Sequence, residues 1–270
     1  MAGSEPPVPR IDTSKPHPAR VYDWFLGGKD NYPVDEALGR HIMSIDNRAK
    51  HVARTNRWFM QRVTRWMAGQ AGVRQYLDIG TGIPTEPNLH QIAQGVAPAS
   101  RVVYTDNDPI VLKHAEALLR STPEGVTDYI QADVREPGRI LEQARKVLDF
   151  EQPIALSLVA LLHFVGDEHR PYELVRQLVD ALPSGSYLVL SQLTADFDPL
   201  AVQRGVDMYA AGGVTLVPRS LAEVGRFFEG LEPTEPGVVQ LTRWHPALGV
   251  DEVSEGNEAA SLYAGVARKP

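Results

Sequence analysis

The sequence predicts an α/β protein built on a mostly parallel sheet. From about residue 73 onward, short apolar segments alternate with segments of helical periodicity, which is typical of a parallel sheet covered on both faces. The apolar segment Gln75–Ile79 runs directly into Gly80 and Gly82 before the next helix. A chain of 270 residues, 43% of them hydrophobic, can bury a sizeable core. We therefore expect one α/β domain, alone or with an appendage.

Composition excludes several classes of protein. The formal net charge of −7 argues against a general nucleic-acid binder or a protein of anionic membrane surfaces, because both need a large cationic surface. The absence of cysteine excludes disulfides and thiolate metal sites. The sequence has no apolar signal region and no run of eighteen apolar residues, so we expect no membrane association and a cytoplasmic protein.

Three zones follow along the chain. Residues 1–18 carry five prolines among small and polar residues, and we expect a mobile tail. Residues 19–72 have aromatic side chains at helical spacing and predict an N-terminal helical cap. Residues 73–270 predict the α/β domain.

The elements of the α/β domain can be placed one after another. The expected strands are Gln75–Ile79, 101–106, 128–133, 153–159, 186–193, 237–244 and 261–269. The expected helices are 85–94, 109–119, 138–147, 171–182 and 221–228. Asp108 and Pro109 are typical of a helix start, and Ser220 with Glu223 forms a capping-box pattern. The last two strands are close enough in sequence to pair antiparallel.

The turn after the first strand does not fit a dinucleotide. The dinucleotide fingerprint places three glycines at G-x-G-x-x-G, and here Thr85 takes the third place after Pro84. Asp78, two residues before the first glycine, would put a carboxylate near the mouth of the site. That carboxylate favours a cation over a diphosphate.

Acidic side chains end the first three expected strands. Asp106 follows the glycines by a little over twenty residues, the place where a carboxylate can accept both hydroxyls of a ribose. Asp133 ends the third strand, and Asp78 lies at the end of the first. Each aspartate alone could be a helix cap or a turn former, but three at one sheet edge indicate a nucleoside site.

The same segments resemble a known family. "LDIGTGIP", "VVYTDNDP" and "YIQADVREP" look like the first three motifs of the class I S-adenosylmethionine-dependent methyltransferases. "ARVYDWFLGGKDNYPVDE", "VALLHFVGD", "RSLAEVGRFFEGLEPTEPGVV" and "YAGVARKP" are similar to a bacterial group of such enzymes long catalogued as a domain of unknown function. The resemblance implies a Rossmann-like, seven-stranded, mostly parallel sheet with the last strand inserted antiparallel. It also implies S-adenosylmethionine (SAM) as methyl donor and S-adenosylhomocysteine (SAH) as product.

The resemblance also implies roles for individual residues. Asp78, Gly80 and Gly82 would line the methionine end of SAM, with glycine backbone close to the cofactor. Asp106 would accept the ribose hydroxyls, and the adenine would be contacted by Asn107, Asp133 and Val134. The apolar segment 158–161 would pass beside the sulfonium, although core packing explains this segment equally well.

Catalysis needs few side chains, because the sulfonium is already activated and a base is required only where the acceptor loses a proton. His163, after the fourth expected strand, is the candidate base, although such a histidine can also be structural. His245 is a weaker candidate. No motif for a metal ion or for a serine nucleophile is present.

The N-terminal segment offers a candidate lid. Tyr22, Trp24, Lys29 and Asn31 surround the pair Gly27–Gly28, a composition suited to a lid that buries an aromatic face and helps to define the acceptor pocket. Alternatively, the aromatic side chains only fix a helical cap to the sheet, and Gly27–Gly28 ends a helix.

Basic residues concentrate between residues 48 and 65, at Arg48, Lys50, His51, Arg54, Arg57, Arg62 and Arg65. We interpret them as a solvated helix face, with a nucleic-acid dock as the alternative. The sequence thus predicts a SAM-dependent methyltransferase that acts on a small-molecule oxygen or nitrogen acceptor. The alternatives are a SAM-binding module without transfer activity and a nicotinamide-dependent oxidoreductase. The acceptor and the oligomeric state are not predicted.

Overall fold

A single sheet organises the chain in the computed structural model, which describes residues 11–118, 120–249 and 260–270. The strands of the described residues are β1 (Gln75–Ile79), β2 (Arg101–Asp106), β3 (Val126–Gln131), β4 (Ala155–Val159), β5 (Tyr187–Leu193), β6 (Glu232–Pro233), β7 (Val239–Gln240) and β8 (Leu262–Arg268). Seven of them follow the order β3-β2-β1-β4-β5-β8-β6, and the short β7 pairs with β8 beside this path. Strands β1 to β5 are parallel, and β8 is antiparallel to both β5 and β6. The predicted fold class, including the antiparallel last strand, is confirmed. The described residues form eight strands and not the expected seven, because two short strands, β6 and β7, lie where one was expected.

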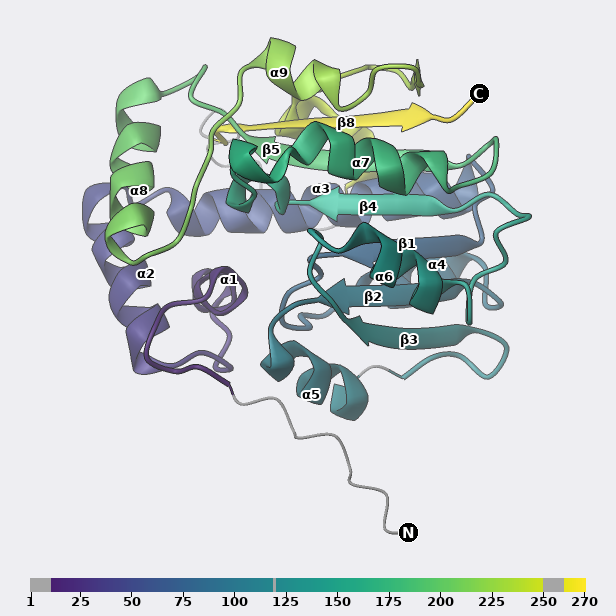
Figure 1. The fold of residues 1–270 in the computed structure, drawn as a ribbon, viewed down its shortest axis with the longest axis horizontal. Coiled ribbons are helices and arrows are strands. Elements are labelled where there is room, and N and C mark those ends of the chain that lie inside the picture. The colour runs from purple at the N-terminus through teal and green to yellow at the C-terminus, as the bar shows by residue number, and fades with distance from the viewer. Residues whose placement is uncertain (1–10, 119, 250–259) are drawn as a thin grey trace, which may run out of the picture.

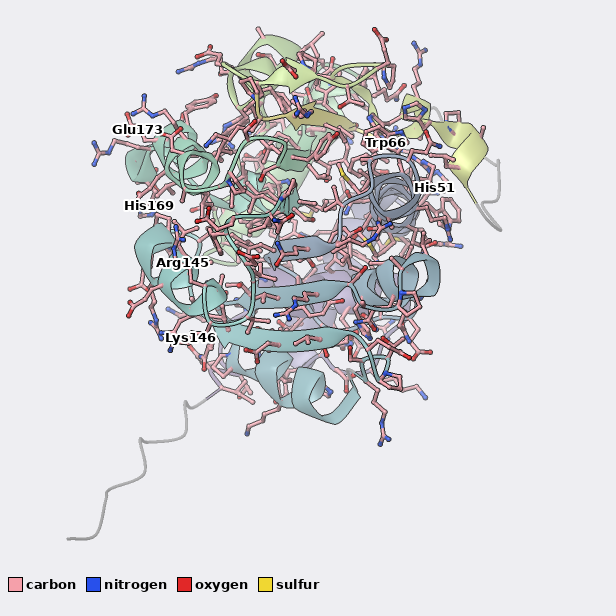
Figure 2. All side chains as sticks on the ribbon, turned by 90° about the vertical axis from the view of Figure 1, so that its right-hand side faces the viewer. His51, Trp66, Arg145, Lys146, His169 and Glu173 are labelled. Carbon is pink, nitrogen blue, oxygen red and sulfur yellow. The ribbon has the colours of Figure 1, made fainter. Side chains whose placement is uncertain are left out.

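Helices cover both faces of this sheet and its carboxyl edge (Figure 1). The α-helices are α1 (Pro18–Leu26), α2 (Pro33–Ile45), α3 (Ala49–Gly69), α4 (Leu89–Val96), α5 (Pro109–Leu118), α6 (Pro137–Ala144), α7 (Pro171–Asp180), α8 (Pro199–Ala211) and α9 (Leu221–Arg226). Short 3-10 turns lie at Leu162–Phe164, Asp167–His169, Leu241–Arg243 and Pro246–Leu248. Figure 2 shows His51 and Trp66 of α3 on one side of the sheet and Arg145, His169 and Glu173 on the other. None of the helices in the described ranges is both long and apolar enough to span a membrane.

Alternating side chains of the strands fill two cores. Leu77 and Ile79 point to the face that packs against α6 and α7, whereas Tyr76, the residue before Leu77, points to the face that packs against α3 and α4. This alternation is the period-two geometry of a strand. Because helices cover both faces, the central strands β1 and β4 are almost fully buried, whereas the edge strand β3 is partly exposed.

The structure corrects several expected elements. Helix α4 begins at Leu89, not at Thr85, because Asn88 and Gln91 form a capping box there. The expected strand 237–244 is wrong beyond Gln240, since the chain turns into a 3-10 helix whose Leu241 packs into the core. Helix α8 is absent from the prediction, and only Val202 and Met208 of its residues are buried, so its apolar stripe is weak.

The N-terminal region is more closely integrated than a tail and a separate cap. Residues 1–10 of the expected tail lie outside the described residues, but the adjoining segment is bonded to the body of the protein. The backbone N–H of His17 donates to Asp35 at 2.8 Å, and Arg20 donates to the carbonyl of Asp12 at 3.0 Å. Residues 11–17 therefore make hydrogen bonds to α1 and α2, and the mobility of the tail stays a prediction. Helix α3 is itself one layer of the main core.

The basic residues of α3 do not form a uniformly solvated face. Arg62 is buried and donates to the carbonyls of Trp244 and Leu241 at 3.0 and 2.9 Å. Arg48 contacts Asp198 at 2.7 Å, whereas Arg54 is exposed. The interpretation as a solvated face holds for part of this helix only, because its other side covers the sheet.

The capping box of α9 can be tested by mutation. The Ser220 hydroxyl accepts from the backbone N–H of Glu223, and the Glu223 side chain accepts from the backbone N–H of Ser220. We expect Ser220→Ala to lower the free energy of unfolding by about 1 kcal/mol, measured by urea denaturation. Ser220→Asp, which keeps an acceptor at the cap, should restore most of the loss. Equal stabilities of all three proteins would contradict the role of the cap.

Candidate functional site

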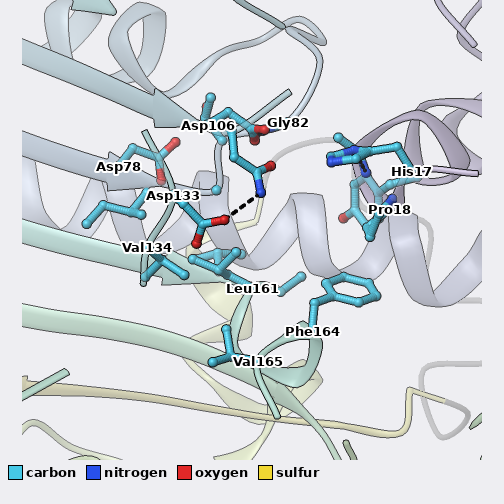
Figure 3. A pocket seen from close by; sticks show the side chains of 18 of the residues that line it. His17, Pro18, Asp78, Gly82, Asp106, Asp133, Val134, Leu161, Phe164 and Val165 are labelled. Carbon is cyan, nitrogen blue, oxygen red and sulfur yellow. Dashed lines mark hydrogen bonds between the residues drawn. The ribbon is translucent and has the colours of Figure 1, made fainter. Parts of the chain in front are cut away.

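A cleft of about 240 Å³ opens at the carboxyl ends of β1, β2, β3 and β4. Strand ends form one wall, and residues of α1 and α3 form the other. Figure 3 shows Asp78, Asp106 and Asp133 on the side of the strands, with His17 and Pro18 facing them across the cleft. This is the edge of an open α/β sheet at which ligands bind, between strands whose connections leave in opposite directions.

The glycine loop forms the floor of the cleft. Gly80 and Gly82 have φ angles of +74° and +68°, which side chains rarely tolerate. A Cβ at Gly80 would lie 2.5 Å from Leu161, so this glycine permits the packing of two loops. A Cβ at Gly82 would meet no protein atom within 4 Å. The backbone of Gly82 is therefore open to a ligand.

Asp78 and Arg57 bring opposite charges to one end of the cleft. Asp78 is 8% exposed, and burial raises the pKa of its carboxyl while the charge of Arg57 opposes that shift. The Arg57 guanidinium donates to the carbonyls of Thr85 and Pro87, and so it also supports the glycine loop. An ammonium group and a carboxylate of one ligand can both be matched here.

Asp106 lies buried at the centre of the strand edge. It accepts the backbone N–H of Gly82 at 2.8 Å and that of Asp108 at 3.0 Å, which fixes its orientation. Burial raises the pKa of its carboxyl. A carboxylate with further lone pairs at this place suits the hydroxyl groups of a ribose.

Asp133, Asn107 and Val134 lie together farther along the same edge. The Asn107 amide donates to Asp133 at 3.0 Å, and Arg135 donates to the same carboxylate at 2.8 Å. Partial burial alone would raise the pKa of Asp133, but the hydrogen bonds from Arg135 and Asn107 lower it to about 2. The apolar Val134 beside this carboxylate lines the cleft. A flat ring with an amino group fits an apolar surface next to an acceptor.

The end of β4 carries a strained residue. Of the expected segment 158–161, Leu158 is core, whereas the next three residues line the cleft. Ala160 has a φ angle of +55°, an unusual value for a residue with a Cβ. Its N–H donates to the Ser191 hydroxyl at 2.8 Å, and that hydroxyl donates to Asn56 at 2.7 Å. Asn56 in turn donates to the Tyr22 hydroxyl at 3.0 Å, so hydrogen bonds join the sheet to α1.

A second cavity, of about 160 Å³, adjoins the cleft. We call it the inner cavity; its lining includes Phe25, Ile42, Val202, Met208, Tyr209 and Leu262. Pro18, Tyr22, Asn56, Ala160 and Phe164 line both spaces. Segments far apart in sequence, α2 and α8, pack together around it (Figure 1).

His163 lines the inner cavity and not the cleft. Burial, with the nearby positive charge of Arg219, lowers the pKa of its imidazole to about 3. The backbone N–H of Leu193 donates to Nδ1 at 3.4 Å, so the proton of the neutral ring is on Nε2. A base of such low pKa does not accept a proton from a weak acid near neutral pH. The expected role of His163 as a general base is not supported by this environment.

Three of the four expected lid residues lie away from the cleft. Tyr22 lines it, but Asn31 donates to the Asp23 carboxylate at 2.8 Å, and Lys29 is exposed. Trp24 packs against Gly39 and lies under Lys50, 4.5 Å from the ring centroid to Nζ. For Trp24 and Asn31 the structure favours the alternative of a structural cap, and Gly27 ends α1 in the left-handed conformation.

His245, the weaker candidate base, also lies away from the cleft. Its ring stands 4.6 Å from that of Trp244 between centroids, and its Nε2 lies 2.8 Å from the carbonyl oxygen of Glu235. It is not among the residues that line the cleft or the inner cavity.

Sequence reasoning missed several residues of the cleft. Asn56 and Arg57 lie within the basic segment of residues 48–65. Its charges alone did not distinguish Arg57, which lines the cleft, from the other basic residues. The helical period offers the missing signal: Asn56 and Arg57 are one turn from Met60, and Met60 belongs to the buried face of α3. Phe164 follows the candidate base in sequence, but nothing in the sequence indicates that it lines both spaces.

The cleft fits an adenosyl cofactor with a zwitterionic side chain. Asp106 provides hydrogen-bond acceptors for the ribose hydroxyls. Asp133 provides a polar edge and Val134 an apolar surface for the adenine. Asp78 and Arg57 provide opposite charges for the amino-acid chain. Helix α4 begins at Leu89, beyond a long loop, so its N-terminus is not delivered to the glycines as a diphosphate site requires.

Comparison with known proteins agrees with this geometry. The family described as S-adenosyl methyltransferase matches residues 4–270. A DUF574 family protein from Streptomyces avermitilis is 48% identical, with a TM-score of 0.92 over 97% of this chain and 100% of that one. A Thermobifida fusca protein assigned provisionally to the methyltransferases is 39% identical, with a TM-score of 0.86 over 97% and 98%.

More distant structures share the fold. A SAM-dependent methyltransferase from Anabaena variabilis is 14% identical, with a TM-score of 0.50 over 98% of this chain and 99% of that one. No protein of curated function matches the chain. The family match spans nearly the whole chain, and it shows that the cofactor is SAM and the product SAH. The chain belongs to the S-adenosyl methyltransferase family and is a SAM-dependent methyltransferase.

Proposed function

We propose that the chain transfers the methyl group of SAM to an oxygen or nitrogen atom of a small molecule. The observation that carries the proposal is the pair of adjoining spaces. The cleft has the polar groups that a nucleoside needs, and the inner cavity meets it at the end of β4. The size of the inner cavity, which residues of α1, α2 and α8 line, favours a small acceptor over a macromolecule.

We assign the cofactor contacts to the residues that line the strand edge. Asp106 accepts from the ribose hydroxyls; Asn107, Asp133 and Val134 contact the adenine. Asp78 accepts from the α-ammonium group, Arg57 donates to the α-carboxylate, and the backbone of Gly80 and Gly82 lies along the methionine chain. Buried carboxylates with fixed hydrogen bonds are pre-organised for a ligand that carries net positive charge.

The contribution of the protein to catalysis is positional. SAM supplies a methyl group on a positively charged sulfur, a leaving group that needs no acid. The chain therefore has to exclude water and hold the acceptor atom in line with the methyl group, which lowers the barrier by orientation. Phe164 and Ala160 close the apolar side of the cleft, and the hydrogen bonds through Ser191, Asn56 and Tyr22 hold the wall between the two spaces.

The two alternative functions, a nicotinamide-dependent oxidoreductase and a SAM-binding module without transfer activity, are not equally compatible with the structure. A nicotinamide-dependent oxidoreductase is disfavoured by the family match and by the late start of α4. A protein of this family that binds SAM without transfer would have the same cleft, so measured transfer separates it from our proposal. The inner cavity supports transfer, because a binding module has no need of a second space at the methyl end.

The cofactor site is tested by thermal unfolding with SAM, SAH or NAD⁺. At a ligand concentration of about 100 times its dissociation constant, binding adds roughly 2.7 kcal/mol and raises the midpoint by several degrees. We expect this rise with SAM and SAH but not with NAD⁺. Asp106→Asn should abolish most of it, while Asp128→Asn, at an exposed position of β3, should leave it unchanged. A rise with NAD⁺ alone would contradict the proposal.

Arg57 is tested with two ligands that differ only in the amino-acid chain. We expect Arg57→Met to weaken SAH binding by about tenfold or more, measured by calorimetry, because a hydrogen-bonded ion pair is lost. Binding of 5′-methylthioadenosine, which lacks the carboxylate, should change little. Arg54→Met, on the same helix but exposed, is the control. Equal losses for both ligands would mean that Arg57 only supports the glycine loop.

The state of His163 is tested by the pH dependence of stability. In the unfolded chain a histidine takes up a proton near pH 6.5, whereas folded His163 does so only near pH 3. Acid therefore stabilises the unfolded state, and the native protein loses stability as the pH falls from 6.5 toward 3. Between pH 7 and pH 5 we expect the native protein to lose about 2 kcal/mol more than His163→Gln. Parallel curves for the two proteins would show that His163 titrates normally.

A further inference from the structure

We propose that the inner cavity is the acceptor site and that it takes a neutral, monocyclic aromatic molecule whose uncharged ring nitrogen receives the methyl group. This inference rests on the proposed function and deepens it. Four observations carry it: the size of the cavity, its continuity with the cleft, its charge, and the absence of an unpaired base that could deprotonate a hydroxyl among the described residues that line it.

Size limits the acceptor to about one ring. The inner cavity measures about 160 Å³. An engineered apolar cavity of about 150 Å³ in another protein binds benzene. A six-membered or five-membered ring with a small substituent therefore fills the inner cavity.

Continuity places the acceptor at the methyl end of the cleft. The five residues that line both spaces belong to α1, to α3 and to the segment after β4, which includes the 3-10 turn Leu162–Phe164. They do not include Asp106, Asn107 or Asp133, which line only the cleft. The inner cavity therefore meets the cleft at Ala160 and Phe164, on the β4 side, and not at the strand ends that carry the proposed ribose and adenine contacts.

Charge excludes ionised acceptors. Asp46 is the one carboxylate among the described residues that line the inner cavity, and Arg48 pairs with it at 2.8 Å. His163 is neutral near pH 7, and burial raises the pKa of the Tyr22 and Tyr209 hydroxyls, so these groups are neutral as well. Transfer of an unpaired ion from water to such a surface is costly.

The lining groups provide hydrogen bonds instead of a base. His163 presents Nε2–H as a donor, and its described contacts leave that proton without an acceptor. The Tyr22 hydroxyl donates to the Ala53 carbonyl at 2.8 Å and accepts from Asn56, which leaves it one lone pair. These groups can orient a polar substituent but cannot remove a proton from a hydroxyl at neutral pH.

A ring nitrogen needs no base. Its lone pair forms the N–CH₃ bond while the S–CH₃ bond breaks, and the electron pair of that bond goes to sulfur. The positive charge moves from sulfur to nitrogen, and no proton is released. Phenolic oxygen, by contrast, must lose a proton to give a neutral product, which the described lining of the inner cavity does not assist.

The test uses the full chain with saturating SAH and three probes of equal ring size: pyridine, phenol and benzoate. We expect saturation-transfer NMR to show contact for pyridine and phenol but not for benzoate. With SAM in place of SAH, mass spectrometry should detect N-methylpyridinium from pyridine and no anisole from phenol. Contact for benzoate would overturn the neutral cavity, and anisole in place of N-methylpyridinium would overturn the nitrogen acceptor.

Two substitutions on α8 locate the site. Val202→Phe places a larger apolar side chain at a buried lining position and should reduce pyridine contact severalfold, with an unchanged thermal shift from SAH. Leu200→Phe, at a position 73% exposed on the same helix, is the matched control. Should Val202→Phe not fold, Gly205→Leu adds volume from a lining glycine whose Cβ would meet nothing within 4 Å.

The outcomes separate this inference from the proposed function. A normal SAH shift without pyridine contact would overturn the acceptor site alone. So would pyridine contact that Val202→Phe, or its replacement Gly205→Leu, does not reduce. A missing SAH shift in the native protein would overturn the proposed function and this inference with it.

Discussion

The packing of α3 across the sheet is the contact on which the site depends. Phe59, Met60, Val63 and Met67 of this helix enter the same core as the alternate side chains of β1, β2, β5 and β8. The helix has 21 residues and the central strands have only 5 to 7, so its first turns extend beyond the carboxyl edge (Figure 1). Asn56 and Arg57 are thereby held over the cleft by a helix whose remaining length is fixed in the core. Hydrophobic packing thus sets the position of polar groups.

The cleft is rigid, and burial of its carboxylates is electrostatically unfavourable when no ligand is bound. Asp78 and Asp106 are buried, which raises the pKa of each carboxyl and makes the free site unfavourable for negative charge. A cationic ligand relieves part of that cost when it binds. The strained backbone of Ala160 lies where the cleft meets the inner cavity and is held by a hydrogen bond to Ser191. Strain of this kind persists where the surrounding structure fixes it, and it is frequent at functional sites.

Local patterns in the sequence predicted the fold and the strand edge, and tertiary contacts decided the rest. Period-two and period-3.6 patterns were sufficient for β1 to β5 and for the order of the helices between them. Helix α8 was missed because its many apolar residues do not form one clear stripe, and only Val202 and Met208 of them are buried. His163 was placed after the correct strand, but its burial depends on residues far away in sequence. The inner cavity could not be predicted for the same reason, since its lining comes from α1, α2, α3, α8 and the strand ends.

The most direct test of this account is a crystal structure of the protein with bound SAH. The account predicts the ribose hydroxyls within hydrogen-bond distance of the Asp106 carboxylate, the amino-acid chain between Asp78 and Arg57, and the sulfur at the wall shared with the inner cavity. SAH bound away from Asp106, or with its sulfur turned from Ala160 and Phe164, would contradict the assignment of both spaces.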